Sequence, residues 1–332
     1  MNYIGSKHRL SSFIQDAIHS VCGQDLSDLV FCDLFAGTGA VGRVFKSQVK
    51  AVIANDLEFY SYVLNRNYIG NYKSFEYSDL IEKLNSLPLQ KGFIAEQYGE
   101  GGVGNRLYFS KHNAQKIDSI RTEVEKWYGN KAISTDVYYF LLASLLESAD
   151  KIANTASVYG SYLKTIKPRA AKGMIITPAT FEITKTAHQV FQEDGNELIT
   201  KISGDILYID PPYNVRQYGA NYHILNTIAK YNIFAPRGKT GLPIYNKSAY
   251  CSKKTVVSSF EQLIKNAQFK YIFVSYSNEG LMSPSVIKKV MEQYGRYDVK
   301  TTSYKRFRAD KTASRHHKAS STIEYLHILE KQ

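Results

Sequence analysis

The chain has 332 residues, 44% of them hydrophobic, and a formal net charge of +12, so it can form one large or two modest domains with a buried core. No run approaches the roughly 18 apolar residues of a membrane span, and the first residues lack the apolar segment of a signal peptide, which favours a cytoplasmic protein. The three cysteines are far apart and lack metal-ligand spacing, so we expect neither a disulfide nor a metal site.

The N-terminal part predicts a strand followed by a glycine-rich turn. Residues 2–7 contain a Gly-Ser loop before a helical pattern, and residues 29–35 form a near-continuous apolar run typical of a buried parallel strand. The next turn matches the pattern G-x-G-x-x-G at Gly37, Gly39 and Gly42. Glycines permit a tight turn and a close approach of the backbone to a ligand, so we expect a ligand here.

A second strand is predicted over residues 51–54, and it ends at Asn55 and Asp56. An acid in this place can bind the two hydroxyls of a ribose. The first third of the chain therefore predicts a cofactor that contains a nucleoside. Sites for NAD and for S-adenosylmethionine share this outline, and these residues leave both open.

The alternation of strands and helices stops after a helical pattern over residues 58–69. Residues 71–186 are rich in helix formers and include a strongly apolar helix over residues 137–152. Strand patterns resume near residue 187. We therefore predict a discontinuous cofactor-binding domain of residues 1–70 and 187–332, with residues 71–186 as an inserted, mainly helical domain.

The most informative stretch follows a buried strand predicted over residues 205–209. There Asp210, Pro211, Pro212 and Tyr213 form a rigid elbow, because neither proline can continue a sheet ladder. In open α/β sheets, ligands bind at the carboxyl ends of strands. A carboxylate, a proline carbonyl and an aromatic ring suit a planar ring that carries an amino group. An ordinary proline turn is the competing interpretation, and composition alone weighs the two about equally.

The last third predicts further strands and one helix. The expected elements are strands over 271–276, 297–303 and 324–329 and a helix over 284–294, with a basic loop between the last two strands.

Basic residues gather in three segments of the sequence. Residues 151–181 contain five Lys and Arg and no acid, residues 211–260 contain seven and no acid, and residues 296–318 contain eight against two acids. A solvated charged face is the usual explanation of such runs. Their segregation, with Tyr and Asn interleaved, favours a nucleic-acid partner over a membrane, for which a basic amphipathic helix is lacking.

The order of the motifs resembles a known enzyme family. The chain carries, in order, residues 2–7, residues 33–39, the Asn55-Asp56 pair, the insertion, and residues 210–213 with the tail Asn214-Val215-Arg216-Gln217-Tyr218. This resembles the α-group of D12-class adenine-N6-specific DNA methyltransferases, of the type paired with restriction nucleases. The resemblance implies an α/β fold, a Rossmann-like S-adenosylmethionine-dependent methyltransferase sheet, with an inserted, mainly helical target-recognition lobe.

The resemblance also implies roles for individual residues. Asp210 and the Pro211 carbonyl would take the hydrogens of the target N6 amine, Pro212 would complete the catalytic tetrapeptide, and Tyr213 would stack on an adenine flipped out of duplex DNA. No metal would be needed. The residues that would bind S-adenosylmethionine are Tyr3, Lys7, Asp33, Phe35, Ala36, Gly37, Thr38, Gly39, Asp56, Asp194 and Asp210.

The expected partners are double-stranded DNA and a cognate restriction endonuclease that acts on the same site, in a bacterial-type, nucleoid-associated setting. The predicted DNA-binding residues are Tyr159, Lys164, Lys167, Arg169, Arg216, Lys253, Lys254 and Arg306. Family members specific for GATC carry an Arg-x-Asn-x-x-Gly-x-Phe-Asn pattern, and Asn154 to Lys164 stands in its place here. We therefore do not expect a GATC target.

Three other functions compete with this interpretation. A nicotinamide-dependent dehydrogenase would explain the glycine turn and Asp56, but it would not explain the basic segments or the proline elbow. A DNA-binding protein without catalysis would explain the charge alone. A methyltransferase for RNA or for cytosine N4 is closer, and within the resemblance an Asp before Pro-Pro-Tyr favours adenine.

Overall fold

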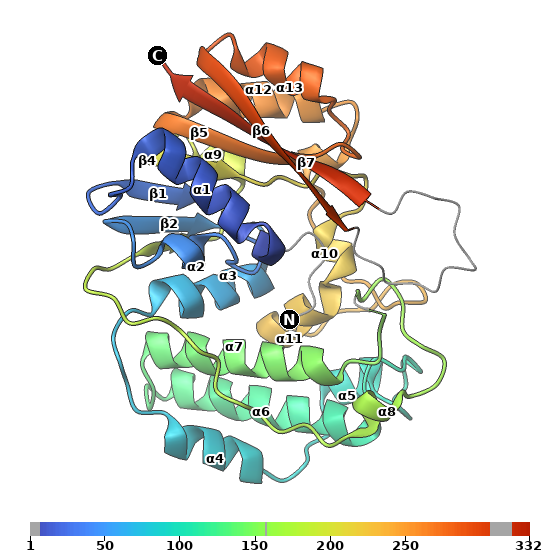
Figure 1. Ribbon diagram of the computed structural model, residues 1–332. Coiled ribbons are helices and arrows are strands. Elements are labelled where there is room, and N and C mark those ends of the chain that lie inside the picture. The colour runs from blue at the N-terminus through green and yellow to red at the C-terminus, as the bar shows by residue number, and fades with distance from the viewer. Residues whose placement is uncertain (1–6, 157, 306–320) are drawn as a thin grey trace. The chain divides into compact units, whose positions relative to one another are not determined.

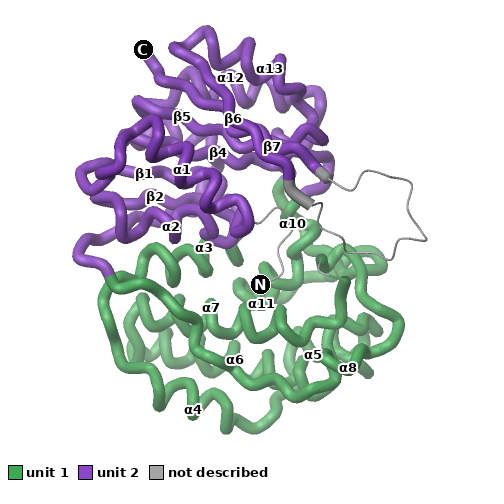
Figure 2. Tube along the Cα trace, in the orientation of Figure 1, with its two compact units in different colours: residues 1–4, 58–183, 218–246 green, residues 5–57, 184–217, 247–332 purple. Residues whose placement is uncertain are grey.

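The computed structural model describes residues 7–156, 158–305 and 321–332, which form two compact units (Figures 1 and 2). Glu58–Ile183 and Tyr218–Asn246 make up the helical unit, and the other described residues make up the sheet unit. Among the described residues, no helix is long and apolar enough to cross a membrane.

The sheet unit contains a seven-stranded sheet in the order β3-β2-β1-β4-β5-β7-β6. Strands β1 to β5 are parallel, and β7 is antiparallel to both of its neighbours. Its strands are β1 (Val30–Asp33), β2 (Ala51–Asn55), β3 (Gln189–Phe191), β4 (Ser203–Ile209), β5 (Gln268–Ser277), β6 (Gly295–Lys305) and β7 (Ser321–Lys331). Its helices are η1 (Lys7–Arg9), α1 (Ser11–Cys22), α2 (Gly42–Phe45), α9 (Gly195–Leu198), η3 (Ala249–Cys251), α12 (Val256–Asn266) and α13 (Pro284–Met291).

Helices cover both faces of this sheet. One row of paired residues crosses five strands on one face, and it consists of Ile53, Cys32, Leu207, Ile272 and Leu329. These side chains share a core with α9, α12 and α13. On the opposite face, the β1 residue Phe31 stacks on Phe45 of α2, with ring centroids 4.5 Å apart. Burial on both faces explains the near-continuous apolar runs of the parallel strands.

The fold predicted from the sequence is confirmed for the sheet. The strands after the glycine turn, before the proline elbow and at the C-terminus all form where their patterns indicate. β6 and β7 place an antiparallel pair next to β5, a pattern that differs from the all-parallel order 3-2-1-4-5-6 of dinucleotide-binding sheets.

The helical unit is built around two long helices, α6 and α7, which pack on each other and on the shorter helices (Figure 1). Its elements are α3 (Phe59–Asn65), η2 (Arg66–Gly70), α4 (Ser78–Ser86), α5 (Phe93–Tyr98), α6 (Lys111–Gly129), α7 (Thr135–Ile152), α8 (Pro168–Ala171), α10 (Tyr218–Asn221) and α11 (His223–Lys230). Ser110 and Ser134 cap the amino ends of α6 and α7 by accepting hydrogen bonds from backbone N–H groups.

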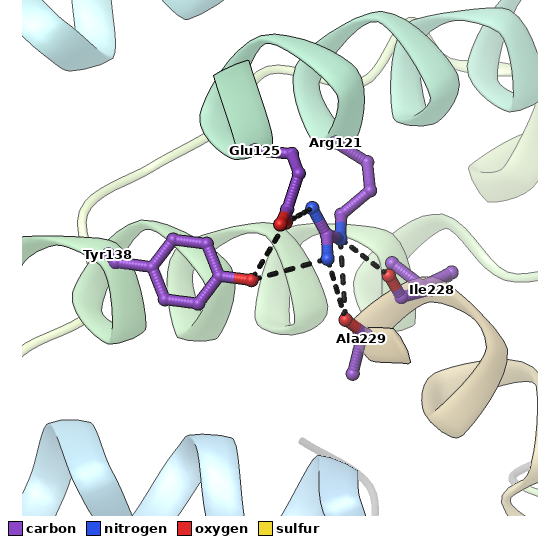
Figure 3. Close-up of polar contacts among 5 residues, drawn as sticks. All are labelled: Arg121, Glu125, Tyr138, Ile228 and Ala229. Carbon is purple, nitrogen blue, oxygen red and sulfur yellow. Dashed lines mark hydrogen bonds and ion pairs between the residues drawn. The ribbon is translucent and has the colours of Figure 1, made fainter. Parts of the chain in front are cut away.

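The C-terminal end of α11 is fixed to α6 by Arg121 (Figure 3). Its guanidinium donates hydrogen bonds to the carbonyl oxygens of Ile228, at 3.1 Å, and Ala229, at 3.1 and 3.3 Å. It also forms an ion pair with Glu125 at 2.6 Å, and the hydroxyl of Tyr138 donates to the same carboxylate. A helix end leaves its last carbonyls without intrahelical partners, so Arg121 satisfies groups that would otherwise be buried unpaired.

The two units divide the chain at other points than the predicted boundaries. Residues 58–70 and 218–246 pack with the helical unit, whereas the sequence analysis assigned both to the cofactor-binding domain. The reason is tertiary packing, since α3 and α11 contact each other and both contact α7. The role of this unit in target recognition stays a prediction.

Candidate active site

Four acidic residues stand at the carboxyl ends of neighbouring parallel strands. Asp33 is the last residue of β1, Asp56 follows β2, Asp194 comes shortly after β3, and Asp210 follows β4. Because these strands are parallel and adjacent, the four residues share one edge of the sheet. We call this the carboxyl edge. The strand pattern of the sequence predicts the same arrangement.

The glycine turn at this edge is held by two of the acids. Gly37 and Gly39 adopt positive φ angles of 52° and 72°, which favour glycine. The Gly37 N–H donates to Asp56 Oδ2 at 2.9 Å, and the Gly42 N–H donates to Asp33 Oδ2 at 3.0 Å. Asp33 and Asp56 thus fix the shape of the turn through its backbone N–H groups.

Asn55 connects the ends of three strands and was not predicted as a site residue. Its side-chain amide donates to the carbonyl oxygens of Leu34 and Glu193, each at 3.1 Å, and its Oδ1 accepts from the Glu193 N–H at 3.0 Å. Its backbone carbonyl accepts from the buried Ala36 N–H at 2.8 Å. Asn55 therefore fixes the path of the chain toward Asp194, which is exposed and caps α9.

Phe35 and Tyr250 form an aromatic corner next to the glycine turn. Their ring centroids lie 5.1 Å apart in an edge-to-face arrangement. The Tyr250 hydroxyl donates to Asn196 Oδ1 at 2.7 Å, which links this corner to α9. Phe35, Thr38 and Ala40 are half-buried and so retain accessible surface at the turn.

Asp210 shares a lysine with Glu324, which is buried. Lys7 Nζ lies 3.2 Å from Asp210 Oδ1 and 2.7 Å from Glu324 Oε1, and Lys7 itself is only 5% exposed. Ser275 on β5 donates to the same Glu324 oxygen at 2.6 Å. The sequence analysis predicted Lys7 and Asp210 in one site, but it missed Glu324 and Ser275.

Burial and mutual interaction shift the pKa values of Asp210 and Lys7. Burial raises the pKa of Asp210 to about 7; Lys7 opposes the shift and Glu324 adds to it. Burial lowers the pKa of Lys7, but its attraction to Asp210 and Glu324 outweighs this and leaves the pKa well above its ordinary value. Lys7 is therefore a fixed cation, and Asp210 is a carboxyl group that can gain or lose a proton near neutral pH.

Asp33 provides a test of whether a cationic cofactor fits this edge. Its Oδ1 atom is buried and has no hydrogen-bond partner among the described residues. Burial raises the pKa of Asp33 to about 7, with a smaller contribution from Asp210. Asp210 and Glu324 thus share Lys7, and Asp33 interacts electrostatically with Asp210, so acidic groups outnumber the lysine in this part of the described structure. A ligand with positive charge and N–H donors, such as the ammonium and sulfonium groups of S-adenosylmethionine, fits that surplus of negative charge.

The proline elbow holds Tyr213 at the edge of the same cluster. Pro211 is buried, Pro212 is half-buried, and the Tyr213 carbonyl accepts from the Leu281 N–H at 2.9 Å. The Tyr213 ring meets the Tyr276 ring edge-to-face with centroids 6.5 Å apart. Backbone and ring contacts thus both limit how far this aromatic group can move.

The predicted DNA-binding residues divide into two groups. Lys164 and Arg169 of the helical unit and Arg216, Lys253 and Lys254 of the sheet unit are exposed. Tyr159 does not fit its predicted role, because its ring is fully buried and its hydroxyl donates to Asp150 at 3.0 Å. Lys167 is half-buried, and its Nζ donates to the Thr155 carbonyl at 2.7 Å. Tyr3 and Arg306 lie outside the described residues.

Comparison with known proteins identifies the family. Residues 3–290 match the family model described as D12 class N6 adenine-specific DNA methyltransferase. The chain is 58% identical to the Type II methyltransferase M.NlaIII of Neisseria lactamica, over 100% of this chain and 99% of that protein.

Two further relatives extend the comparison. The Type II methyltransferase M.CviAII of Paramecium bursaria Chlorella virus 1 is 40% identical over 94% of each chain. The Type II methyltransferase M.FokI of Planomicrobium okeanokoites is 36% identical over 100% of this chain and 53% of that protein. The family match covers the glycine turn, the proline elbow and the helical unit together, and the chain belongs to the D12 class of N6 adenine-specific DNA methyltransferases.

Proposed function

We propose that this enzyme methylates N6 of an adenine that has been flipped out of a specific duplex DNA site, and that Asp210 and Tyr213 act directly on that base. The observation that supports this most strongly is the position of Asp210. It is a largely buried carboxyl group beside an aromatic ring, at the sheet edge that also carries the glycine turn. A base inside a duplex cannot reach such a group, so the adenine must leave the stack.

S-adenosylmethionine would supply the methyl group from its sulfonium. The residues proposed to hold it are the turn from Phe35 to Gly39 and the acids Asp33, Asp56 and Asp194, together with Lys7. The unpartnered Asp33 Oδ1 supports this assignment, because it needs a donor that the described residues do not provide. Tyr3 is part of the same proposal through the family resemblance.

The transfer needs no covalent enzyme intermediate. The N6 lone pair forms the new N–C bond as the C–S bond breaks, and the sulfur keeps the bonding electrons and becomes a neutral thioether. The nitrogen then carries a positive charge and must lose a proton. Asp210 and the Pro211 carbonyl accept the two N–H groups beforehand, which orients the lone pair, and the Asp210 carboxylate is placed to receive the proton.

We further propose that the enzyme protects DNA from a cognate restriction endonuclease. The support is that its relatives at 58%, 40% and 36% identity are Type II methyltransferases. The exposed basic residues Lys164, Arg169, Arg216, Lys253 and Lys254 are proposed to contact the phosphate backbone, which would position the duplex without reading its sequence.

Mass spectrometry of nucleosides tests this function. Duplex DNA is incubated with S-adenosylmethionine that carries a labelled methyl group and is then digested to nucleosides. Labelled N6-methyl-2′-deoxyadenosine is the expected product, whereas label in N4-methyl-2′-deoxycytidine, or in RNA incubated in a parallel sample, would support the competing functions. Asp210→Ala should lower turnover by roughly two to three orders of magnitude, the usual loss when an electrostatic contact to the transition state is removed. Full activity in this variant would contradict the assignment of Asp210.

The role of Tyr213 is tested separately, by the activity of its variants on DNA that contains the target adenine. In binding experiments 2-aminopurine, which has no N6 amine, replaces that adenine as a fluorescent probe. Stacking on an aromatic ring contributes about 1–3 kcal/mol per base, so Tyr213→Trp should retain activity and Tyr213→Ala should lose most of it. Fluorescence of 2-aminopurine should rise on binding if the base leaves the stack, apart from quenching by the ring. Equal losses in both variants would show that the phenol hydroxyl or the exact shape of the ring matters, and not stacking alone.

A further inference from the structure

Glu324 is an acid on the buried side of a strand, where an apolar residue is the usual occupant. It is 1% exposed and lies in β7 with the same alternation as Leu326 and Ile328, both of which are buried. Its Oε2 atom has no hydrogen-bond partner among the described residues. Burying a carboxylate costs free energy that pairing recovers only in part, so the fold gains little stability from a charge here.

The contacts of Glu324 could be made without a charge. Its Oε1 atom receives both Lys7 Nζ, at 2.7 Å, and Ser275 Oγ, at 2.6 Å. The oxygen of a glutamine would accept the same two hydrogen bonds in the same place. A neutral side chain would therefore satisfy the geometry, so the negative charge matters through its electrostatic effect on Lys7 and on Asp210.

The group on which it acts is Asp210, because the two carboxylates compete for Lys7. Lys7 Nζ is closer to Glu324, at 2.7 Å, than to Asp210, at 3.2 Å. We propose that Glu324 is a positioning residue that draws Lys7 partly away from Asp210 and so keeps Asp210 a stronger proton acceptor than a full ion pair would allow. This inference rests on the proposed role of Asp210 in accepting hydrogens from the N6 amine.

The charges around Asp210 support the direction of the effect. Burial raises the pKa of Asp210, Lys7 on η1 lowers it, and Glu324 on β7 raises it. Asp33 at the end of β1 and the hydroxyls of Tyr208 and Tyr213 also face this cluster. A base works best when its pKa lies near the working pH, and the resulting value of about 7 meets that condition.

The test is the pH dependence of kcat/KM and of kcat in Glu324→Gln. Removing one negative charge near Asp210 should move the acid limb of both profiles to lower pH by about one unit. The weaker base should also lower kcat on the plateau, by about threefold. Glu330→Gln is the matched control, since Glu330 lies on the same strand but is one-third exposed and pairs with Arg296 at 2.8 Å. Its profile should equal that of the unchanged enzyme.

A second variant keeps the inference falsifiable if Glu324→Gln does not fold. Ser275→Ala removes the hydroxyl that shares Glu324 Oε1, so Glu324 should attract Lys7 more strongly and the acid limb should move to higher pH. The inference is wrong if the acid limb does not move, or moves in the opposite direction, in whichever of Glu324→Gln and Ser275→Ala folds. Glu324 would then have a structural role only. Asp210→Ala separates the two claims: an inactive Asp210→Ala with an unmoved limb in Glu324→Gln rejects this inference alone, whereas an active Asp210→Ala rejects the proposed function.

Discussion

Two aspartates, one in each unit, show how differently a protein can treat a buried carboxylate. Asp118 of the helical unit accepts four hydrogen bonds of 2.6–2.9 Å. Their donors are the backbone N–H groups of Gly92, Ile94 and Ala95 and the hydroxyl of Tyr231. In the part of the chain that the structure describes, Asp210 of the sheet unit receives one donor, Lys7, and shares it with Glu324.

The difference separates a structural group from a reactive one. Asp118 uses both oxygens to fix the start of α5 and the residue after α11, and a ligand would have to displace these donors. Asp210 keeps acceptor capacity for a substrate and lies at the edge of a sheet, where the strands end. Near Asp210, one oxygen each of Asp33 and Glu324 also has no hydrogen-bond partner among the described residues, so these groups too can still accept hydrogen bonds. Local departures from full hydrogen bonding of this kind are expected at functional sites.

The largest effect on stability is expected at Asp118. Asp118→Asn replaces an acceptor by an amide that cannot accept all four donors, so buried N–H groups lose their partners. A decrease of about 3–5 kcal/mol in the free energy of unfolding is expected, measured by urea denaturation. Asp79→Asn on α4 is the control, because Asp79 is an exposed acid of the same unit, and it should change stability little. If Asp118→Asn changes the free energy of unfolding only slightly, Asp118 is not the structural group that distinguishes it from Asp210 in this comparison.

Asp210 is expected to behave in the opposite way, as a residue that costs stability. Its pKa in the folded protein is raised to about 7, above the ordinary value of 3.8. The folded state therefore binds more protons than the unfolded state between these values, and its stability falls as pH rises through this window.

Asp210→Asn removes this titration, so the variant should gain stability over the unchanged enzyme as pH rises. The gain should grow by up to about 1.4 kcal/mol per pH unit between roughly pH 4 and 7 and then level off. Denaturation at a series of pH values measures it. A difference that does not depend on pH would show that the Asp210 carboxyl titrates alike in both states, contrary to this account.

Much of the carboxyl edge could be predicted from the sequence because its signals are local. An apolar run followed by glycines, or a strand followed by two prolines, fixes where a strand ends and which residue stands there. Asp33, Asp56 and Asp210 follow from that logic alone. Asp194 follows from the short strand before it, although β3 begins two residues later than its pattern indicates.

The residues that escaped prediction depend on long-range packing. Glu324 meets Lys7 across 317 positions of sequence, and only its place on the apolar side of a strand distinguishes it from a surface acid. The assignment of residues 218–246 to the helical unit depends on contacts such as those of Arg121 with the end of α11, which no local pattern encodes. Tyr159 shows the converse error, since an aromatic residue in a basic segment can equally be core.

The smallest expected effects concern the basic residues around Tyr159, where the same contrast between satisfied and available groups applies. Lys164 and Arg169 are exposed, whereas Lys167 donates hydrogen bonds from its Nζ to the Thr155 carbonyl and from its backbone N–H to Asn154 Oδ1.

The double variant Lys164→Gln, Arg169→Gln should lower the slope of log affinity against log salt by up to about 0.9 for each DNA phosphate that it no longer neutralises. Lys167→Gln should leave that slope nearly unchanged and instead cost about 1 kcal/mol of stability, because it removes a hydrogen bond within the unit. Binding titrations at several salt concentrations measure the slopes, with Lys83→Gln as a control outside the basic segment. If Lys167→Gln lowers the slope as much as the double variant does, the Lys167 amino group contacts DNA despite its hydrogen bond to Thr155. A hydrogen bond within the protein would then not distinguish lysines that bind DNA from those that do not.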